Sequence, residues 1–402
     1  MRLGIVALFI SLITLSANAQ QISYEYGEGL TIQSKDSNYK LLLSGRIQTL
    51  FVSEKPSNVG EAWVNELSIR RARIKMDGHV FSPKLVYKLE FGLSERDRII
   101  RTDQYDSKKV PNFILDAVLK YKLTKNLEVW AGQTKLPGNR ERVVSSQSLQ
   151  IVDRSQVNSI FNLDREIGVQ LRAKQSYGKM VVKQIGSLSL GEVRNSMFTN
   201  LGGNHYVARV EFLPFGEFKS KGDYFESDLK REAKPKLSFG LTYSYNDKAV
   251  RQTSTGRYLI NSSGAYMQHD LATVLVDALI KYKGFSTTFE YANKTAVGDH
   301  SSIAENVGSS LIDSSGRTYF TGQGINLQSG YLFKNNFEVA GRYTRVTPDR
   351  AKSFKAQNEY TLALSKYIVG HTLKMQADVS YIDFDGTPSD EIRYRIQLEI
   401  GF

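Results

Sequence analysis

A two-residue alternation of apolar and polar side chains runs through most of this chain. Residues 391–402 show it most clearly: isoleucine, tyrosine, leucine or phenylalanine fills every even position, and arginine, glutamine, glutamate or glycine lies between them. Successive side chains of a strand point to opposite faces, so this segment is a strand with one apolar and one polar face. The pattern recurs along the chain with no helical stretch between, which excludes βαβ units and predicts an all-β protein.

We expect about 16 such strands. They cover residues 40–52, 65–80, 84–93, 112–123, 126–134, 164–174, 178–187, 204–213, 236–247, 270–283, 284–295, 318–333, 336–346, 358–368, 371–382 and 391–402. The links between them alternate in length, with long segments followed by short turns such as 124–125 and 334–335. Long external loops alternating with short periplasmic turns are typical of outer-membrane barrels.

A soluble β-sandwich and a membrane barrel both show this alternation, but they turn opposite faces outward. The apolar faces here carry aromatic residues near their ends, for example Tyr121, Tyr243 and Tyr381, as the aromatic girdles of a barrel require. The polar faces carry lysine and arginine in mid-strand, which suits a wet lumen. The sequence therefore predicts a transmembrane antiparallel β-barrel of about 16 strands, wide enough for an aqueous channel.

The first 19 residues have the form of an export signal. Arg2 precedes an apolar run over residues 3–15, and Ala17 and Ala19 form a small-residue cleavage site. The run is too short to span the ~30 Å of hydrocarbon in a bilayer. We expect residues 1–19 to be cleaved and residues 20–402 to form one domain in the bacterial outer membrane. The absence of cysteine fits a protein of the bacterial envelope better than a eukaryotic extracellular protein held together by disulfides.

One connection breaks the alternation of lengths. Residues 214–235 form a long link where a short periplasmic turn is expected. The link holds five basic and five acidic residues, so it is electrically balanced. We expect a solvated periplasmic excursion rather than a partner site.

The net charge of +12 comes from 53 basic and 41 acidic residues. Strand parity, meaning that every second residue of a strand points to the same face, places much of the basic excess inside the barrel. Arg71, Arg73 and Lys75 take successive inward positions in the second strand, a basic ladder about 13 Å long. Parity also turns inward Arg46, Lys88, Lys120, Lys122, Arg172, Lys174, Arg209, Arg342, Lys374, Arg393 and Arg395. Acids such as Glu90 also face inward, so an alternative is that these charges pair across strands. Arg70 falls on the lipid side, so either it lies above the apolar band or a β-bulge resets the register there, and we leave it unassigned.

The longest loop, residues 135–163, is the third external loop. It contributes Lys135, Arg140, Arg142 and Arg154, and its apolar pieces at 143–144 and 149–152 are unusual for an exposed loop. We expect the loop to fold into the barrel, where its bases would narrow the pore. The alternative is a loop that lies over the outer rim.

Several short motifs resemble the phosphate-selective porin O and P family, in its Bacteroidetes-type branch. They are residues 45–48 (GRIQ), 70–73 (RRAR), 132–137 (GQTKLP), 153–155 (DRS), 164–170 (DREIGVQ) and 222–225 (GDYF). The resemblance covers essentially the whole mature chain. It implies a trimeric 16-stranded porin with an inward third loop and passive uptake of anions, and it suggests Arg46, Arg71 and Arg73 as anion-binding positions. The family's loop lysine cluster is replaced here by Lys135 and three arginines, so general anion preference is better supported than phosphate selectivity.

We therefore expect a water-filled, anion-preferring channel for passive diffusion of small solutes such as phosphate. Rings of arginine and lysine are how anion pores are built. The expected partners are outer-membrane lipid, small anionic solutes, further copies in a homotrimer, and the barrel-insertion machinery, which would read the terminal Phe402. We expect no cofactor, no metal and no nucleic acid, because the bases are spread over strands rather than clustered on one helix or arm.

The alternatives are an outer-membrane barrel enzyme and a scaffold without channel activity. The five histidines are scattered, and neither G-x-S-x-G nor H-E-x-x-H is present. A catalytic group could still be assembled from different strands.

Overall fold

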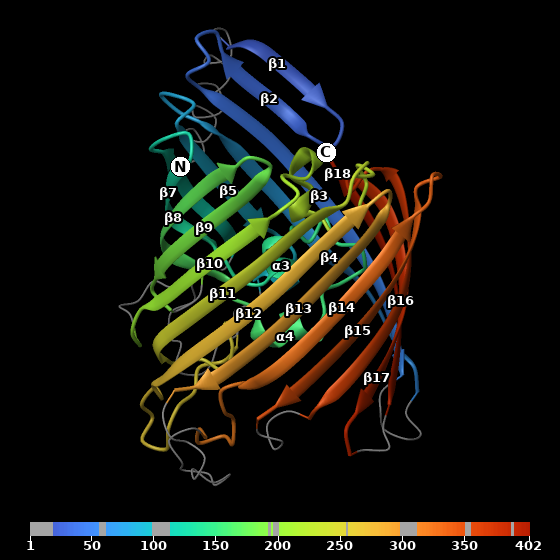
Figure 1. Ribbon diagram of the computed structural model, residues 1–402. Coiled ribbons are helices and arrows are strands. Elements are labelled where there is room, and N and C mark those ends of the chain that lie inside the picture. The colour runs from blue at the N-terminus through green and yellow to red at the C-terminus, as the bar shows by residue number, and fades with distance from the viewer. Residues whose placement is uncertain are drawn as a thin grey trace, which may run out of the picture.

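The structure is a computed structural model that describes residues 19–55, 62–98, 113–191, 194–195, 201–254, 256–297, 312–349, 355–386 and 390–402. Within these ranges sixteen antiparallel strands, β3 to β18, form a closed barrel (Figure 1). Each strand pairs with the next along the chain, and β18 pairs back to β3. The predicted 16-stranded barrel is therefore confirmed.

The barrel strands coincide with the segments predicted from alternation, and their ends differ by at most four residues. They are β3 (Lys40–Lys55), β4 (Val64–His79), β5 (Leu85–Gly92), β6 (Ile114–Lys122), β7 (Leu127–Lys135), β8 (Arg165–Tyr177), β9 (Met180–Ser189), β10 (His205–Leu213), β11 (Lys236–Ala249), β12 (His269–Tyr282), β13 (Phe285–Ala296), β14 (Gly322–Leu332), β15 (Phe337–Pro348), β16 (Gln357–Val369), β17 (Leu373–Phe384) and β18 (Glu391–Gly401).

In the part of the chain that the structure describes, helices are few and short. They are α2 (Glu95–Arg98), α3 (Arg140–Val143), α4 (Gln156–Phe161) and the 3-10 helix η2 (Lys219–Tyr224), all in segments between strands. Among the described residues, no helix is both long and apolar enough to span a bilayer.

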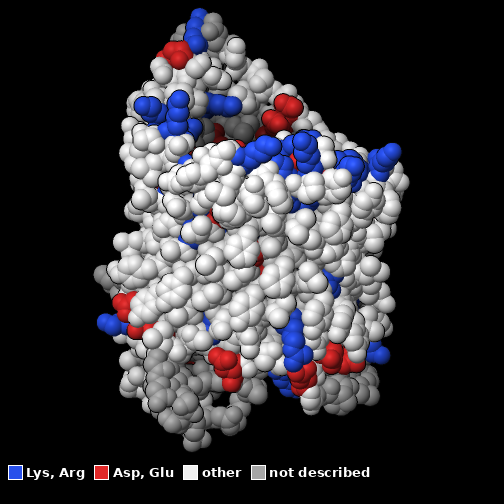
Figure 2. Space-filling model, viewed as in Figure 1, with Lys and Arg blue, Asp and Glu red and all other residues white. Residues whose placement is uncertain are grey.

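The two faces of each strand have opposite character, as the alternation predicts. On β11, the odd-numbered Leu241 and Tyr243 are 48% and 50% exposed, whereas the even-numbered Ser238 and Thr242 are buried. The wall is a single sheet, so the buried face is the inner one. Figure 2 shows a largely uncharged outer surface, with lysine and arginine gathered along the rim that carries the short turns. This apolar belt is the surface that lipid requires.

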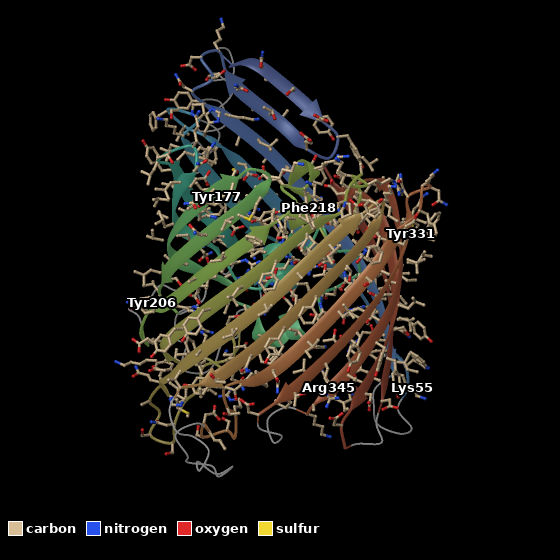
Figure 3. The ribbon with its side chains drawn as sticks, viewed as in Figure 1. Lys55, Tyr177, Tyr206, Phe218, Tyr331 and Arg345 are labelled. Carbon is tan, nitrogen blue, oxygen red and sulfur yellow. The ribbon has the colours of Figure 1, made fainter. Side chains whose placement is uncertain are left out.

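Tyrosines mark both edges of the belt. Tyr177 and Tyr331 lie near the end with the short turns, called the turn end below, and Tyr206 lies nearer the opposite loop end (Figure 3). All three are roughly half exposed. Amphipathic rings in these positions match the interfacial girdles of membrane barrels.

An N-terminal hairpin that the alternation did not predict extends the sheet beyond the barrel. Its strands are β1 (Ala19–Glu25) and β2 (Gly29–Ser34), and β2 pairs with the start of β3 (Figure 1). The connecting turn uses Gly27 and Gly29, both at positive φ, a conformation that glycine adopts at no steric cost.

A β-bulge in β4 settles the face of Arg70. The register between β3 and β4 shifts where Gln48 pairs with Arg71 and Thr49 pairs with Ile69, which leaves Arg70 as the extra residue. Its guanidinium forms an ion pair with Asp153 of the third loop. The bulge therefore turns both Arg70 and Arg71 inward, and a strict two-residue parity fails at this point.

The third loop, residues 136–164, contacts the inner face of β10 to β18. Its apolar side chains from α4, Val157, Ile160 and Phe161, pack in one buried cluster with inward-facing Leu275 of β12 and Val346 of β15. Figure 1 shows α3 and α4 behind the front strands of the barrel. The inner wall therefore carries apolar side chains where α4 packs against it.

The link over residues 214–235 does not form a solvated excursion, and that expectation was wrong. Its residues Phe218, Glu226, Ser227 and Asp228 are all buried. The Ser227 hydroxyl donates to Glu338 of β15 at 2.6 Å, which places the link inside the barrel against the inner wall. Composition could not reveal this, because the acids of the link find their hydrogen-bond donors inside the lumen.

Candidate pore lining

One large cavity of about 1940 Å³ occupies the lumen. Strands β4 to β9 line one side of it, and the third loop and the 214–235 link line the other. Its walls reach from Lys125, in the short turn between β6 and β7, to Arg251, in the long loop after β11. The cavity therefore extends along the barrel between its two ends.

The walls of the cavity are rich in bases. Nineteen basic side chains line it against nine acidic ones. The basic residues are Arg70, Arg71, Arg73, Lys88, Lys120, Lys122, Lys125, Lys135, Arg142, Arg154, Arg165, Arg172, Lys174, Lys183, Arg194, Lys221, Arg251, Arg393 and Arg395. A cavity with this excess inside a low-dielectric wall raises the local concentration of anions.

Eight of the twelve bases predicted from the sequence line this cavity. They are Arg71, Arg73, Lys135, Arg142, Arg154, Arg172, Arg393 and Arg395. The other four lie elsewhere in the barrel, and each has a structural reason.

Arg46 and Lys75 do face inward, as parity predicts, but both are paired away from the cavity. Arg46 donates to Glu399 at 2.8 Å, across the seam where β18 meets β3. Lys75 forms an ion pair with Asp77 at 2.5 Å on its own strand. The predicted ladder in β4 therefore shifts by one step, and its three cavity-lining members are Arg70, Arg71 and Arg73.

Arg140 and Arg342 are buried structural groups rather than pore-lining ones. Arg140 is 1% exposed and donates to Asp277 of β12 at 2.7 Å and to Ser238 of β11 at 2.9 Å. Arg342 of β15 donates to the backbone carbonyl of Asp153 in the third loop at 2.8 Å. Both hold the third loop against the wall.

Most arginines in the cavity wall are neutralised by carboxylates. Arg73 pairs with Glu90 at 3.1 Å and with Asp97 at 3.0 Å. Arg395 donates to both oxygens of Asp378, at 2.7 and 2.9 Å. The alternative of cross-strand pairing thus holds for these residues, whose positive charge is largely cancelled locally.

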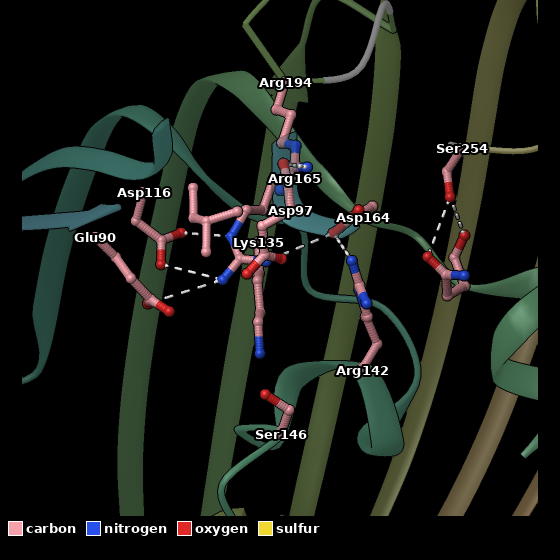
Figure 4. A network of polar contacts seen from close by, with 12 residues as sticks. Glu90, Asp97, Asp116, Lys135, Arg142, Ser146, Asp164, Arg165, Arg194 and Ser254 are labelled. Carbon is pink, nitrogen blue, oxygen red and sulfur yellow. Dashed lines mark hydrogen bonds and ion pairs between the residues drawn. The ribbon is translucent and has the colours of Figure 1, made fainter. Parts of the chain in front are cut away.

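The start of β8 is the centre of a larger ion-pair network (Figure 4). Arg165 donates to Asp116 of β6 at 3.0 Å, and Arg142 of the third loop pairs with Asp164. Burial acts to raise the pKa of Asp164, but Arg142 and Arg165 hold that pKa well below its usual range. Asp164 is therefore ionised at neutral pH, and the network fastens the end of the third loop to β8.

Lys135 and Arg154 differ from the neutralised bases. The Lys135 ammonium donates to the backbone carbonyls of Val143 and Val144 at 3.3 and 3.1 Å, and Figure 4 shows it standing apart from the carboxylates of the network. Arg154 donates to the carbonyls of Glu141 and Val144 at 2.6 and 2.8 Å. Burial and nearby Arg142 lower the pKa of Arg154 to about 9, which leaves it charged at neutral pH. The hydrogen-bond partners of these two side chains are carbonyl oxygens, which orient them without adding a compensating negative charge.

A second basic group lies closer to the turn end. The indole of Trp130 on β7 lies between Lys120 of β6, 4.0 Å from the ring centroid, and Arg172 of β8, 4.2 Å away. Arg172 also donates to Gln170 at 2.8 Å. A ring face attracts a cation without cancelling its charge.

Parity placed Arg70 on the lipid side, and the sequence prediction missed six further cavity-lining bases: Lys125, Arg165, Lys183, Arg194, Lys221 and Arg251. Lys183 lies on β9 between Val181 and Ile185, which are inward, buried and apolar. A rule that assigns polar residues inward and apolar residues outward cannot find it. Arg194 and Arg251 come from long loops, to which strand parity does not apply.

Comparisons with known proteins agree with this architecture. The anion-selective porin from Comamonas acidovorans is similar in structure, with a TM-score of 0.54 and 11% identity over 90% of this chain and 100% of that one. The outer-membrane channel DcaP of Acinetobacter baumannii has a TM-score of 0.54 and 12% identity over 92% of this chain and 99% of that one. A loop-deletion mutant of OmpT, an outer-membrane protein of Vibrio cholerae, has a TM-score of 0.52 and 10% identity, over 90% and 99%.

At these identities the neighbours share the fold alone. A comparison with curated protein sequences found no match. The family described as phosphate-selective porin O and P matches residues 44–249, just over half of the chain. The motifs at 45–48, 70–73, 132–137, 153–155, 164–170 and 222–225 all fall inside this span. The chain therefore belongs to the phosphate-selective porin O and P family of outer-membrane channels.

Proposed function

We propose that this porin is a water-filled, anion-preferring channel through which small solutes such as phosphate diffuse passively. The observation that carries the proposal is the cavity wall, where nineteen bases face nine acids. Lys135 and Arg154 matter most within it, because their partners are backbone carbonyls rather than carboxylates, so no paired acid competes with a passing anion. Charge-assisted hydrogen bonds from such groups suit phosphate and carboxylate oxygens.

Planar-bilayer recording tests the proposal. A KCl gradient across a membrane that holds the purified protein should give a reversal potential that favours chloride. Added phosphate should reduce the chloride current if the site binds phosphate, and should leave it unchanged if the channel is a general anion pore. A reversal potential that favours potassium would contradict the proposal.

Lys135→Gln is the most specific variant for the selectivity test. It removes a cavity cation whose partners are carbonyls, so the chloride-over-potassium permeability ratio should fall severalfold. Lys75→Gln is the matched control, because Lys75 is paired with Asp77 and does not line the cavity. Equal effects of the two substitutions would show that selectivity comes from overall charge rather than from the cavity wall.

The assembly and export of the chain complete the proposal. Residues 1–19 would be removed on export, and residues 20–402 would be inserted into the outer membrane as a homotrimer, in line with the family resemblance. Phe402 is half exposed, and its backbone pairs with Gly45 at the seam between β18 and β3. Before this seam closes, the insertion machinery would recognise Phe402. N-terminal sequencing of the mature protein and chemical cross-linking in membranes test these points.

A hydrolytic activity has one observation in its favour. The Ser244 hydroxyl lies 2.7 Å from His205 Nε2, and His205 Nδ1 lies 2.9 Å from Glu166, in the order nucleophile, base and acid. Ser244 is only 2% exposed, however, and the adjoining cavity of about 30 Å³ has room for roughly one water. We therefore assign these three residues to joining β8, β10 and β11. A fluorophosphonate probe should leave Ser244 unlabelled, and labelling that is lost in Ser244→Ala would favour the enzyme.

A further inference from the structure

The link between β10 and β11, residues 214–235, enters the barrel from the turn end. Its first part packs at the rim, where the Lys236 ammonium donates to the carbonyl of Phe215 at 2.7 Å. Phe218 then inserts into a buried cluster with the inward-facing Val181 of β9 and Leu279 of β12. The link is thus fastened to the inner wall as soon as it leaves β10.

The middle of the link runs along the inner wall from β12 to β16. Lys281 of β12 donates to the carbonyls of Gly222 and Ser227, both at 2.8 Å. The Ser227 hydroxyl is also 2.5 Å from the hydroxyl of Tyr367 on β16. Asp228 accepts the backbone N–H of Gly284 at 2.8 Å, in the short turn between β12 and β13. These polar groups are buried, and each is satisfied by the wall, so the docked position of the link is specific.

The link then meets the third loop inside the barrel. The backbone N–H of Gln150 donates to the Glu226 carboxylate at 2.8 Å, and the Glu226 N–H donates to the Ser148 carbonyl at 3.2 Å. Arg140 of α3 donates to the Asp223 carbonyl at 2.7 Å. The loop comes from one end of the barrel and the link from the other, and together they fill the side of the lumen that faces β11 to β17.

We propose that the 214–235 link is a second constriction of this channel. It fills the turn-end part of the lumen on the side of β11 to β17, fixes the inner edge of the third loop, and confines the solute path to the strip along β4 to β9. Its cavity-facing residues, including Lys221 and Tyr224, form the wall opposite Lys120, Trp130 and Arg172. Solute size is therefore limited at the periplasmic side as well as at the third loop. This inference rests on the channel activity proposed above.

Replacement of residues 217–233 by a short glycine–asparagine turn tests the constriction. Single-channel conductance of the variant should rise at least twofold, and liposome swelling should admit larger sugars than the intact protein does. Wild-type currents measured in parallel separate the two proposals: a conducting wild type with an unchanged deletion variant would overturn the constriction and leave the channel function intact.

A second measurement does not depend on removing the link. The chain has no cysteine, so a single introduced cysteine is the only thiol. Lys221→Cys places that thiol in the cavity wall, and a small anionic methanethiosulfonate reagent should reduce its current by roughly half or more. Lys179→Cys is the control, in the exposed short turn between β8 and β9, and its current should not change. A Lys221→Cys current that the reagent leaves unchanged would show that the link does not border the solute path.

Discussion

Arg140 offers the sharpest test of how the third loop is held in the barrel. Its guanidinium lies at the junction of three elements: it donates to Asp277 of β12, to Ser238 of β11 and to the Asp223 carbonyl of the 214–235 link. Arg140→Met keeps much of the side-chain volume but removes all three bonds. The substitution should loosen the loop without opening the barrel.

The structure sets the size of this effect. Removal of one partner from a buried ion pair costs about 3–5 kcal/mol, because the remaining charge is left unpaired. Asp277 keeps a second partner, Arg209, which donates to it at 2.6 and 3.1 Å. We therefore expect the lower end of the range, about 3 kcal/mol. At ~1.4 kcal/mol for each factor of ten, the undocked fraction of the loop should rise about a hundredfold.

Limited trypsin digestion of the folded barrel measures this fraction. The loop keeps two tryptic sites in the variant, at Arg142 and Arg154, and both are mostly buried while the loop is docked. When opening is fast relative to cleavage, the cleavage rate follows the population of the open form. Cleavage within the loop should therefore be about a hundredfold faster in Arg140→Met than in the wild type.

Arg345→Met is the matched control. Arg345 also pairs with a carboxylate, Asp385 at 3.1 Å, but both side chains are at least 40% exposed. Pairs of this kind contribute ~0–1 kcal/mol, so cleavage of the third loop should stay close to the wild-type rate. If Arg140→Met remains a folded barrel and is cleaved no faster than Arg345→Met, the buried contacts of Arg140 do not hold the loop.

Three further predictions concern the wall and its filling. Gly132→Ala should lower the free energy of unfolding of the barrel by ~1–3 kcal/mol, because Gly132 has a φ of +124° and a new Cβ would lie 2.3 Å from the carbonyl oxygen of Ala117 on β6. Gly186→Ala, where no atom lies within 4 Å, should leave the free energy of unfolding unchanged, and urea unfolding of both variants measures the difference. Phe161→Ala should weaken the docking free energy of the third loop by about 3–5 kcal/mol, because Phe161 is 2% exposed in the inner apolar cluster. Trypsin should therefore cleave the loop of this variant faster. Burial acts to raise the pKa of Asp164, but Arg142 holds it well below its usual range, so the stabilisation is present above about pH 3.9 and is lost only at lower pH. Protection of the loop from a protease should therefore not fall between pH 7 and pH 5, and a loss in that window would contradict the assignment.

The strands were predictable because lipid imposes a simple rule on the outer face. Every outward side chain must be apolar and every backbone group must pair within the sheet, so the alternation fixes both the number of strands and their faces. The rule failed at Arg70, where one extra residue in β4 turns two successive arginines inward. A bulge depends on the pairing of two strands, and a single strand sequence does not carry that information.

The sequence of β12 contains a signal for packing inside the lumen, which the alternation rule did not use. Residues 271–280 of β12 are almost continuously apolar, so both faces of this strand must be covered. The structure supplies the second cover, because Leu275 packs against the third loop and Leu279 against Phe218 of the link. A strand with two apolar faces in a barrel of alternating strands thus indicates where something packs inside.

The net charge of the chain is a poor guide to the charge that a solute meets. Parity can place a base inside the barrel, but whether that base is neutralised depends on the facing residue of the next strand or loop. Arg73 and Arg395 have carboxylates within 3.1 Å, whereas Lys135 and Arg154 bond to carbonyls of the third loop. A loop backbone supplies hydrogen-bond acceptors that carry no formal negative charge, so it orients a base without cancelling the attraction of that base for an anionic solute. Anion preference in this porin should therefore depend more on the fold of the third loop than on the number of inward arginines.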